Sequence, residues 1–231
     1  MSPKVILTGS SHSDSKASTA NFAGFLVGHL EYITVLKDLS SRSAGRTAKD
    51  FLGVVEQVEG SNPTTHRGSS KANDKEFYKF SKKWAKEHDG DDLDYILGTL
   101  LERLVYSKAY KRFIRPNSKH EVNVKVQIEH SLGFCDSGEQ NLDFAGWDQN
   151  EIKGEFYECK KGISINKPKC RLLTDIKDAL DAKSTVAVIS LESRARLVGA
   201  IEQVHPGIAS KINLVGFDDL EAGFLNNPSS S

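Results

Sequence analysis

Three residues in the middle of the chain have the types and spacing needed for metal-assisted hydrolysis of a phosphate ester. Asp143 lies in an apolar run at 142–147, and Glu158 and Lys160 lie two residues apart in a run at 155–160. The 14 residues between Asp143 and Glu158 are enough for two adjacent antiparallel strands and their turn. Such a hairpin would place the two carboxylates side by side, with Glu158 and Lys160 on one face of the sheet.

Two neighbouring carboxylates favour a cation between them. About 4 Å apart, they repel by roughly 4 kcal/mol at an effective dielectric constant near 20, and a divalent cation removes that repulsion. Carboxylate oxygens suit Mg²⁺ (or Mn²⁺), with waters and a substrate phosphate completing the coordination shell. We therefore predict a metal site at Asp143 and Glu158, with Lys160 holding or polarising the water that attacks phosphorus.

The same residues also fit a structural role. An acid followed two residues later by lysine occurs five times in this sequence, so the tripeptide alone has little weight. Glu158 and Lys160 would then form an ion pair on the solvated face of an edge strand, contributing a few tenths of a kcal/mol. The context favours the catalytic interpretation, because the aromatic pair Phe156 and Tyr157 precedes Glu158 and an upstream acid lies in a paired strand.

The surrounding elements follow from hydrophobic periodicity. Residues 93–105 carry apolar side chains at helical spacing, and Pro116 marks where that helix has ended. The period then changes to two over 122–128, and further strands are expected at 142–147 and 155–160, with a turn at 135–140 between the first two. Four more elements follow: a helix at 172–182, a strand at 185–189, a helix at 194–204 and a strand at 212–215. The order predicts an α/β fold with a hairpin-built sheet extended by crossovers.

The acid-bearing runs resemble the active-site hairpin of the PD-(D/E)XK nuclease superfamily, the fold of restriction endonucleases and Holliday-junction resolvases. The runs are LDFAGW at 142–147 and FYECKK at 156–161, and the resemblance spans about residues 93–192. It implies a restriction-endonuclease-like core with the order α-β-β-β-α-β and a mixed sheet flanked by helices. It also implies a Mg²⁺-dependent endonuclease or phosphodiesterase.

The resemblance assigns a role to each residue of the cluster. Asp143 and Glu158 match the acids that bind the metal, and Lys160 matches the lysine that assists the attacking water. Leu142 stands where the proline in the family name would be. The family often adds a glutamate from the first helix, and Glu102 is the positional candidate, although its helical angle also fits a solvated surface residue.

Basic charge is concentrated on both sides of the predicted site, although the chain carries 31 basic and 31 acidic residues overall. Residues 103–125 hold seven basic residues against one acid, and residues 153–177 hold seven against three. Such segments neutralise the phosphates of nucleic acid. We predict nucleic-acid contacts, to DNA more than RNA, at Lys108, Lys111, Arg112, Arg115, Lys161, Lys169 and Arg171.

The N-terminal residues are predicted to form a separate lobe. A strand at 5–7, a helix from Ser18 or Thr19 and a segment at 32–36 that can turn into a strand together make a β-α-β unit. We expect four parts: an α/β lobe at 1–59, a flexible linker at 60–75, a nuclease core at 76–225 and a disordered tail at 226–231.

Two other functions remain open. The first strand and the serine-rich loop after it, at 4–15, are similar to the start of flavodoxin-like flavin reductases, and such a loop can bind phosphate at a helix N-terminus. The later glycines of a GxGxxG motif are missing, which disfavours a flavin or nucleotide protein. A catalytically inactive module on the nuclease fold, binding nucleic acid or protein, is the other alternative, and the intact acid-acid-lysine set counts against it.

Composition excludes several classes. Cys135, Cys159 and Cys170 form no CxxC pair, which argues against a disulfide framework and a tetrahedral zinc site. No apolar run approaches the roughly 20 residues that cross a bilayer, and no GxSxG or GxxxxGK[ST] motif is present. We expect a cytoplasmic enzyme without membrane contact, and a homodimer, because cutting both DNA strands needs two sites.

Overall fold

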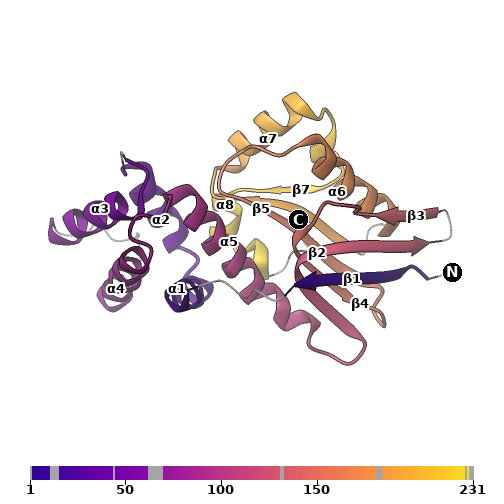
Figure 1. Ribbon diagram of the computed structural model, residues 1–231, viewed down its shortest axis with the longest axis horizontal. Helices are drawn as coiled ribbons and strands as arrows, with labels where there is room; N and C mark the ends of the chain where they lie inside the picture. Colours follow the sequence, from indigo (N-terminus) through magenta and orange to yellow (C-terminus); the bar gives the residue numbers. More distant parts are fainter. Residues whose placement is uncertain are drawn as a thin grey trace. The chain divides into compact units, whose positions relative to one another are not determined.

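The computed structural model describes residues 2–10, 16–43, 45–61, 70–130, 133–180, 184–226 and 228 (Figure 1). The chain divides into two compact units. One unit combines Met1–Ser13 with Val105–Ser231, and we call it the sheet unit; the other is Asp14–Leu104, which we call the helical unit. Within the described residues, no helix has both the length and the apolar character needed to cross a membrane.

The sheet unit is built on one seven-stranded mixed sheet. Its strands are β1 (Lys4–Ser10), β2 (Ser118–His130), β3 (Gly133–Asp136), β4 (Leu142–Asp148), β5 (Lys153–Lys160), β6 (Ser184–Ser190) and β7 (Asn213–Val215). The spatial order is β1-β2-β4-β5-β6-β7, and β3 pairs with β2 as a hairpin off this path. Strands β1, β2, β4 and β5 pair antiparallel, whereas β5, β6 and β7 pair in parallel.

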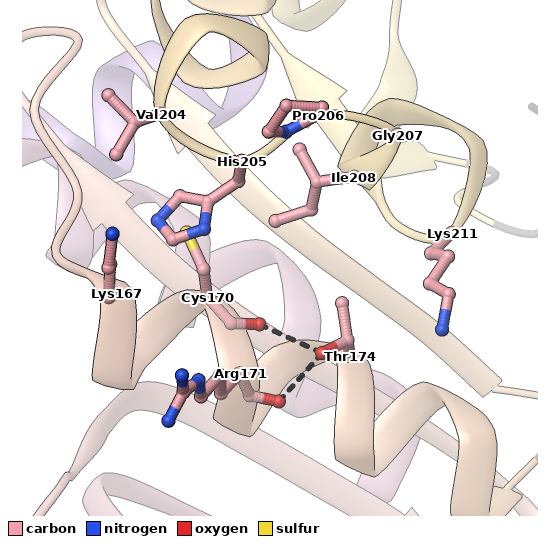
Figure 2. Close-up of a pocket in the computed structure, with 10 residues that line it drawn as sticks. All are labelled: Lys167, Cys170, Arg171, Thr174, Val204, His205, Pro206, Gly207, Ile208 and Lys211. Atoms are coloured by element: carbon pink, nitrogen blue, oxygen red, sulfur yellow. Dashed lines mark hydrogen bonds between the residues drawn. The ribbon is translucent and has the colours of Figure 1, made fainter.

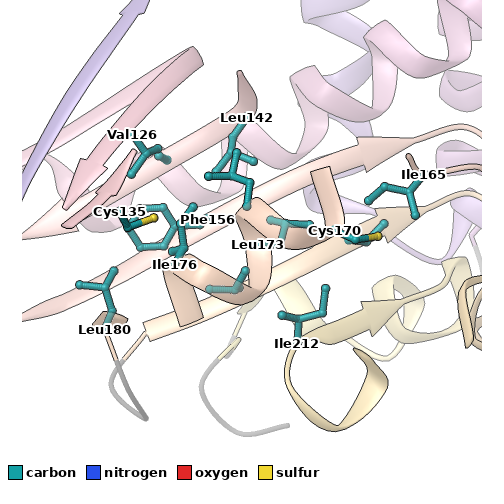
Figure 3. Packing of buried hydrophobic residues seen from close by; sticks show 14 of the residues in the cluster. Val126, Cys135, Leu142, Phe156, Ile165, Cys170, Leu173, Ile176, Leu180 and Ile212 are labelled. Atoms are coloured by element: carbon teal, nitrogen blue, oxygen red, sulfur yellow. The ribbon is translucent and has the colours of Figure 1, made fainter. Parts of the chain in front are cut away.

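Helices connect the parallel strands and cover the sheet. The sheet unit contains the end of α5 (Leu93–Ala109), then η1 (Tyr110–Phe113), α6 (Lys167–Leu180), α7 (Arg194–Val204), η3 (Ile208–Ser210), α8 (Phe217–Glu221) and η4 (Phe224–Asn226). The buried face of α6, with Leu173 and Ile176, packs into one core with Phe156, Val126 and Leu142 of the strands (Figure 3). This core fixes α6 against the face of β5 that carries the even-numbered side chains.

The opposite face of the sheet is aromatic. Phe144 of β4 stacks on Tyr157 of β5 with ring centroids 5.8 Å apart. Phe113 of η1 and Tyr106 of α5 lie against Phe144 at 6.2 and 6.3 Å. Because successive side chains alternate across a strand, this aromatic layer leaves Glu158, next to Tyr157, to point toward α6.

The helical unit contains no strand among its described residues. It consists of α1 (Ala17–Gly28), α2 (Tyr32–Ser41), α3 (Ala48–Gly60), α4 (Lys71–Glu87) and the start of α5. Phe22 of α1 lies 5.8 Å from Phe77 and 5.7 Å from Trp84 of α4 between ring centroids, and all three are fully buried. Thr47 and Asp50 form a capping box that starts α3.

The predicted N-terminal β-α-β lobe is wrong. Val5 pairs with Ile128, so β1 belongs to the main sheet and not to a local unit. Residues 32–36 are helical, because Tyr32, Ile33 and Leu36 recur at the 3.6-residue period and are all buried. The predicted boundary at 60–75 also differs from the two units, since α4 packs with α1 in one aromatic core.

The rest of the predicted order differs in detail. The α/β class with a mixed sheet flanked by helices is confirmed. The segment expected to be a turn at 135–140 is partly β3, which returns along β2. Residues 62–69 of the predicted linker, and residues 227 and 229–231 of the predicted tail, lie outside the described residues.

Candidate active site

The β4–β5 hairpin positions the predicted acids. The carboxylate of Asp148 accepts hydrogen bonds from the backbone N–H groups of Asn150 (2.8 Å) and Glu151 (3.0 Å), which closes the turn between the strands. The turn sets the register, in which Phe144 pairs with Tyr157. The backbone pairs end there, so Asp143 lies one residue before the last pair on β4 and Glu158 one residue after it on β5.

Asp143 lies just beyond the last backbone pair between β4 and β5. Its Oδ2 accepts a hydrogen bond from the backbone N–H of Cys159 at 2.6 Å. A carboxylate in this position replaces a backbone acceptor and is held in place by the neighbouring strand. Asp143 is therefore fixed beside the backbone of Cys159, between Glu158 and Lys160 in the sequence.

Glu158 is the most deeply buried member of the cluster, with 2% of its surface exposed. Its Oε1 lies 2.6 Å from Lys160 Nζ, and its Oε2 lies 2.9 Å from Lys169 Nζ. The second contact has an ion-pair distance but not hydrogen-bond geometry, so Oε2 is a buried oxygen without a hydrogen bond. A buried carboxylate with no counter-charge is strongly unfavourable, and the two ammonium groups compensate it here.

Lys160 is held as a cation. Burial by itself would lower the pKa of Lys160, but the attraction of the Glu158 and Asp143 carboxylates and the hydrogen bond to Glu158 outweigh burial, and the pKa is raised. A lysine with a raised pKa is protonated at neutral pH, so Lys160 acts as a hydrogen-bond donor and a positive charge.

The donor set fits a hard divalent cation. Within the described part of the chain, no group of three or more His, Cys, Asp and Glu side chains is arranged to hold a metal. Two carboxylates on adjacent strands are still the arrangement in which Mg²⁺ keeps several waters and takes further oxygens from a substrate. Oε2 of Glu158 lacks a hydrogen bond, but Lys169 Nζ lies 2.9 Å from it, so a metal ion bound to Oε2 would have to displace that ammonium group.

Lys169 is a member of the cluster that the sequence did not place there. It was predicted to contact nucleic acid, but it lies on the first turn of α6, is mostly buried, and hydrogen-bonds the backbone carbonyl of Asn141 as well as approaching Glu158. Asn166 caps this turn by accepting from the backbone N–H of Lys169 at 2.9 Å. No periodicity links residues 158 and 169, because their proximity depends on the path of the loop between β5 and α6.

Arg112 is also held differently from the prediction. Its guanidinium forms a two-point ion pair with Glu155, at 2.6 Å from Nε and 2.5 Å from Nη2, and donates to the carbonyl of Leu225 at 2.9 Å. Glu155 is 1% exposed and also accepts a hydrogen bond from the Tyr157 hydroxyl at 2.8 Å. Arg112 therefore compensates a buried charge, and its predicted contact with nucleic acid stays a prediction.

The remaining predicted contacts have mixed environments. Lys108 donates to Asn226 at 2.8 Å, and Arg115 pairs with Glu151 at 2.9 Å. Lys111 is exposed, and Lys161 directly follows β5. Arg171 lines a cavity beside α6. Nucleic-acid contact by these residues stays a prediction.

Glu102 belongs to the other compact unit. It lies on the part of α5 before Val105, within the helical unit, and is half-buried. Its predicted role as an additional catalytic acid stays a prediction.

The fold and the cluster together define an α/β protein with a mixed sheet that carries an acid-acid-lysine set on a hairpin. No known family model matches the sequence, and no curated protein matches it. Among solved structures, the chain is similar to protein VC1899 from Vibrio cholerae, with a TM-score of 0.50 and 14% sequence identity. The match covers 97% of this chain and 58% of VC1899, so the chain spans less than two thirds of that protein, and the likeness concerns the fold alone.

Proposed function

We propose that this protein is a metal-dependent nuclease that hydrolyses phosphodiester bonds, with DNA as the expected substrate, on a restriction-endonuclease-like core. The observation that carries the proposal is the convergence of Asp143, Glu158 and Lys160 from two adjacent strands. Two acids from adjacent strands, together with a lysine that is protonated at neutral pH, are suited to displacement at phosphorus.

Each residue has a part that follows from its environment. Asp143 and Glu158 would hold Mg²⁺ (or Mn²⁺), which supplies positive charge to phosphate oxygens and lowers the pKa of bound water when present. Lys160, protonated at neutral pH, donates hydrogen bonds to the attacking water or to a phosphate oxygen, and its positive charge stabilises negative charge that develops there. The hydrogen bond from Cys159 keeps the Asp143 carboxylate oriented.

Cleavage of plasmid DNA, single-stranded DNA and RNA in Mg²⁺ tests the proposal. We expect Asp143→Asn and Lys160→Gln to lose activity by about 10²-fold or more, the size of effect expected when one electrostatic group is removed. Lys153→Gln is the matched control, because Lys153 lies at the other end of the same strand. Equal cleavage by wild type and all three variants would attribute the activity to a contaminant and contradict the proposal.

A binding module without catalysis is the second candidate, and one observation favours it. The charge of Glu158 is already balanced by Lys160 and Lys169, so the cluster is stable without a metal. In that case the wild-type protein would bind nucleic acid or a protein, with no cleavage of any substrate in Mg²⁺ or Mn²⁺.

The flavin or nucleotide alternative based on the N-terminal loop has less support. Residues 11–15 of that loop lie outside the described residues, and the β-α-β unit on which the likeness depends is not formed locally. A homodimer, which cutting both strands would need, is part of the nuclease proposal and is tested by measuring the mass of the protein in solution.

A further inference from the structure

A cavity lies in the sheet unit, between α6 and the turn that follows α7 (Figure 2). Its volume is about 370 Å³, within the usual range for small-molecule sites. The α6 side contributes Lys167, Cys170, Arg171 and Thr174, and the other side contributes residues 204–208 and Lys211. Lys169, which contacts Glu158, does not line it.

The cavity is positively charged. Lys167 and Arg171 lie four residues apart on α6, a spacing that places them on the same helix face, where like charges repel. Neither side chain forms an ion pair or hydrogen bond with the described residues. No acidic residue is among the described residues that line the cavity. An anion between the two cations would relieve their repulsion.

Asp175 lies four residues after Arg171 on α6 but forms no ion pair with it, and two other carboxylates near the cavity have other partners. Asp178 forms an ion pair with Lys211, in which Oδ2 lies 3.0 Å from Nζ. Glu202 accepts hydrogen bonds from the backbone N–H groups of Gly207 and Ala209, both at 2.7 Å. These contacts leave Lys167 and Arg171 as the cations open to a ligand on this side of the cavity.

The other wall is apolar and aromatic. Val204 is 51% exposed and lies on one side of the His205 ring, with Ile208 on the other side (Figure 2). The His205 ring projects from the end of α7 toward α6, with Lys167 and Arg171 on one side and Lys211 on the other (Figure 2). His205 Nε2 is buried and has no hydrogen-bond partner in the described part of the chain.

We propose that this cavity binds a nucleotide. Lys167 and Arg171 would hold its phosphate, since a guanidinium matches phosphate oxygens with two parallel hydrogen bonds. The base or sugar would lie against Val204 and the His205 ring, which line the cavity. The nucleotide is either a free mononucleotide or one unit of a nucleic-acid strand, and the phosphate chemistry is the same. The inference does not depend on the proposed nuclease activity, because none of these residues belongs to the acid-acid-lysine set.

Calorimetric titration of the full chain in EDTA tests this site without cleavage. The probes are AMP, adenosine, inorganic phosphate and a five-nucleotide single-stranded DNA without a terminal phosphate. We expect AMP or the DNA to bind, and Arg171→Gln to weaken binding about tenfold or more, because a charged hydrogen bond to phosphate is lost. Lys49→Gln, which removes an exposed lysine of α3, is the matched control and should bind as wild type does.

The probes separate the two sources of the phosphate. Binding of AMP indicates a free nucleotide, and binding of the DNA alone indicates a unit of a strand. Three results would overturn the proposal: no saturable binding of either at millimolar concentration, equal affinity in wild type and Arg171→Gln, or adenosine or inorganic phosphate binding as tightly as the best nucleotide probe. Thermal unfolding of Arg171→Gln checks that the exposed substitution leaves the fold intact.

Discussion

Glu158 and Lys169 join β5 to α6 through an ion pair in which Lys169 Nζ lies 2.9 Å from Glu158 Oε2. The same ammonium donates to the carbonyl of Asn141, just before β4. One lysine thus ties together the start of β4, the end of β5 and the first turn of α6. It also occupies the carboxylate oxygen that a metal ion would need.

Replacing Lys169 should separate these two effects. In EDTA, we expect Lys169→Met to reduce the free energy of unfolding by about 1–3 kcal/mol, because Glu158 loses a charged partner in a buried place. Under the nuclease proposal, added Mg²⁺ should stabilise the variant more than the wild type, since no ammonium competes for Oε2. Urea unfolding with and without Mg²⁺ measures both changes.

The control for this experiment is Lys167→Met, an exposed lysine on the same turn of α6. It should change the free energy of unfolding by less than about 0.5 kcal/mol. If Lys169→Met behaves like this control in EDTA, the ion pair with Glu158 has no energetic weight.

Arg112 should be more important for stability than for binding. Arg112→Met leaves the buried Glu155 with only the Tyr157 hydroxyl, and we expect a loss of about 3–5 kcal/mol in the free energy of unfolding. Arg115→Met breaks an ion pair whose side chains are 68% and 52% exposed, and should lose less than about 1 kcal/mol. Urea unfolding of both variants measures the two losses of unfolding free energy. Similar losses would contradict the stronger contribution expected of the buried Arg112–Glu155 ion pair.

The stabilising contribution of Lys160 should depend on pH only in the alkaline range. Its pKa is raised in the folded protein, mainly because attraction to Glu158 and Asp143 outweighs burial. The contribution is therefore complete below the unfolded value, near 10.4, and is lost as pH rises through the higher folded value. The difference in unfolding free energy between wild type and Lys160→Gln should stay constant from neutral pH to about pH 9.5 and shrink above about pH 10.5. A decline near neutral pH would contradict the raised pKa.

Two of the three buried cysteines, Cys135 and Cys170, should be unreactive. Burial raises the pKa of Cys135 and of Cys170 to about 11. At pH 8, roughly one thiol in a thousand is then a thiolate, the form that reacts with disulfide reagents. We expect both to react slowly with a chromogenic disulfide in native protein and fully in guanidinium chloride. Rapid reaction in the native state, followed by mass spectrometry of the labelled peptide, would show that they are accessible.

The elements with a clear local period were predictable from sequence alone. Alternation placed Glu158 and Lys160 on one face of β5, and apolar periodicity predicted a helix with the bounds that α7 has, Arg194–Val204. The antiparallel pairing of β4 with β5 was also predictable, because a short turn joins the two strands.

Contacts between distant segments were decided by the tertiary structure. The composition of Lys4–Ser10 predicts a strand but does not say which strand it pairs with. Its pairing with β2 buries Val5 in the common core, and that depends on the tertiary structure. Lys169 and Arg112 look like surface cations in the sequence, yet each lies where a buried carboxylate, Glu158 or Glu155, needs a positive charge. Sequence determines which side chains can carry charge or be buried, but the free energy of burying a carboxylate arises only once the chain has folded around it.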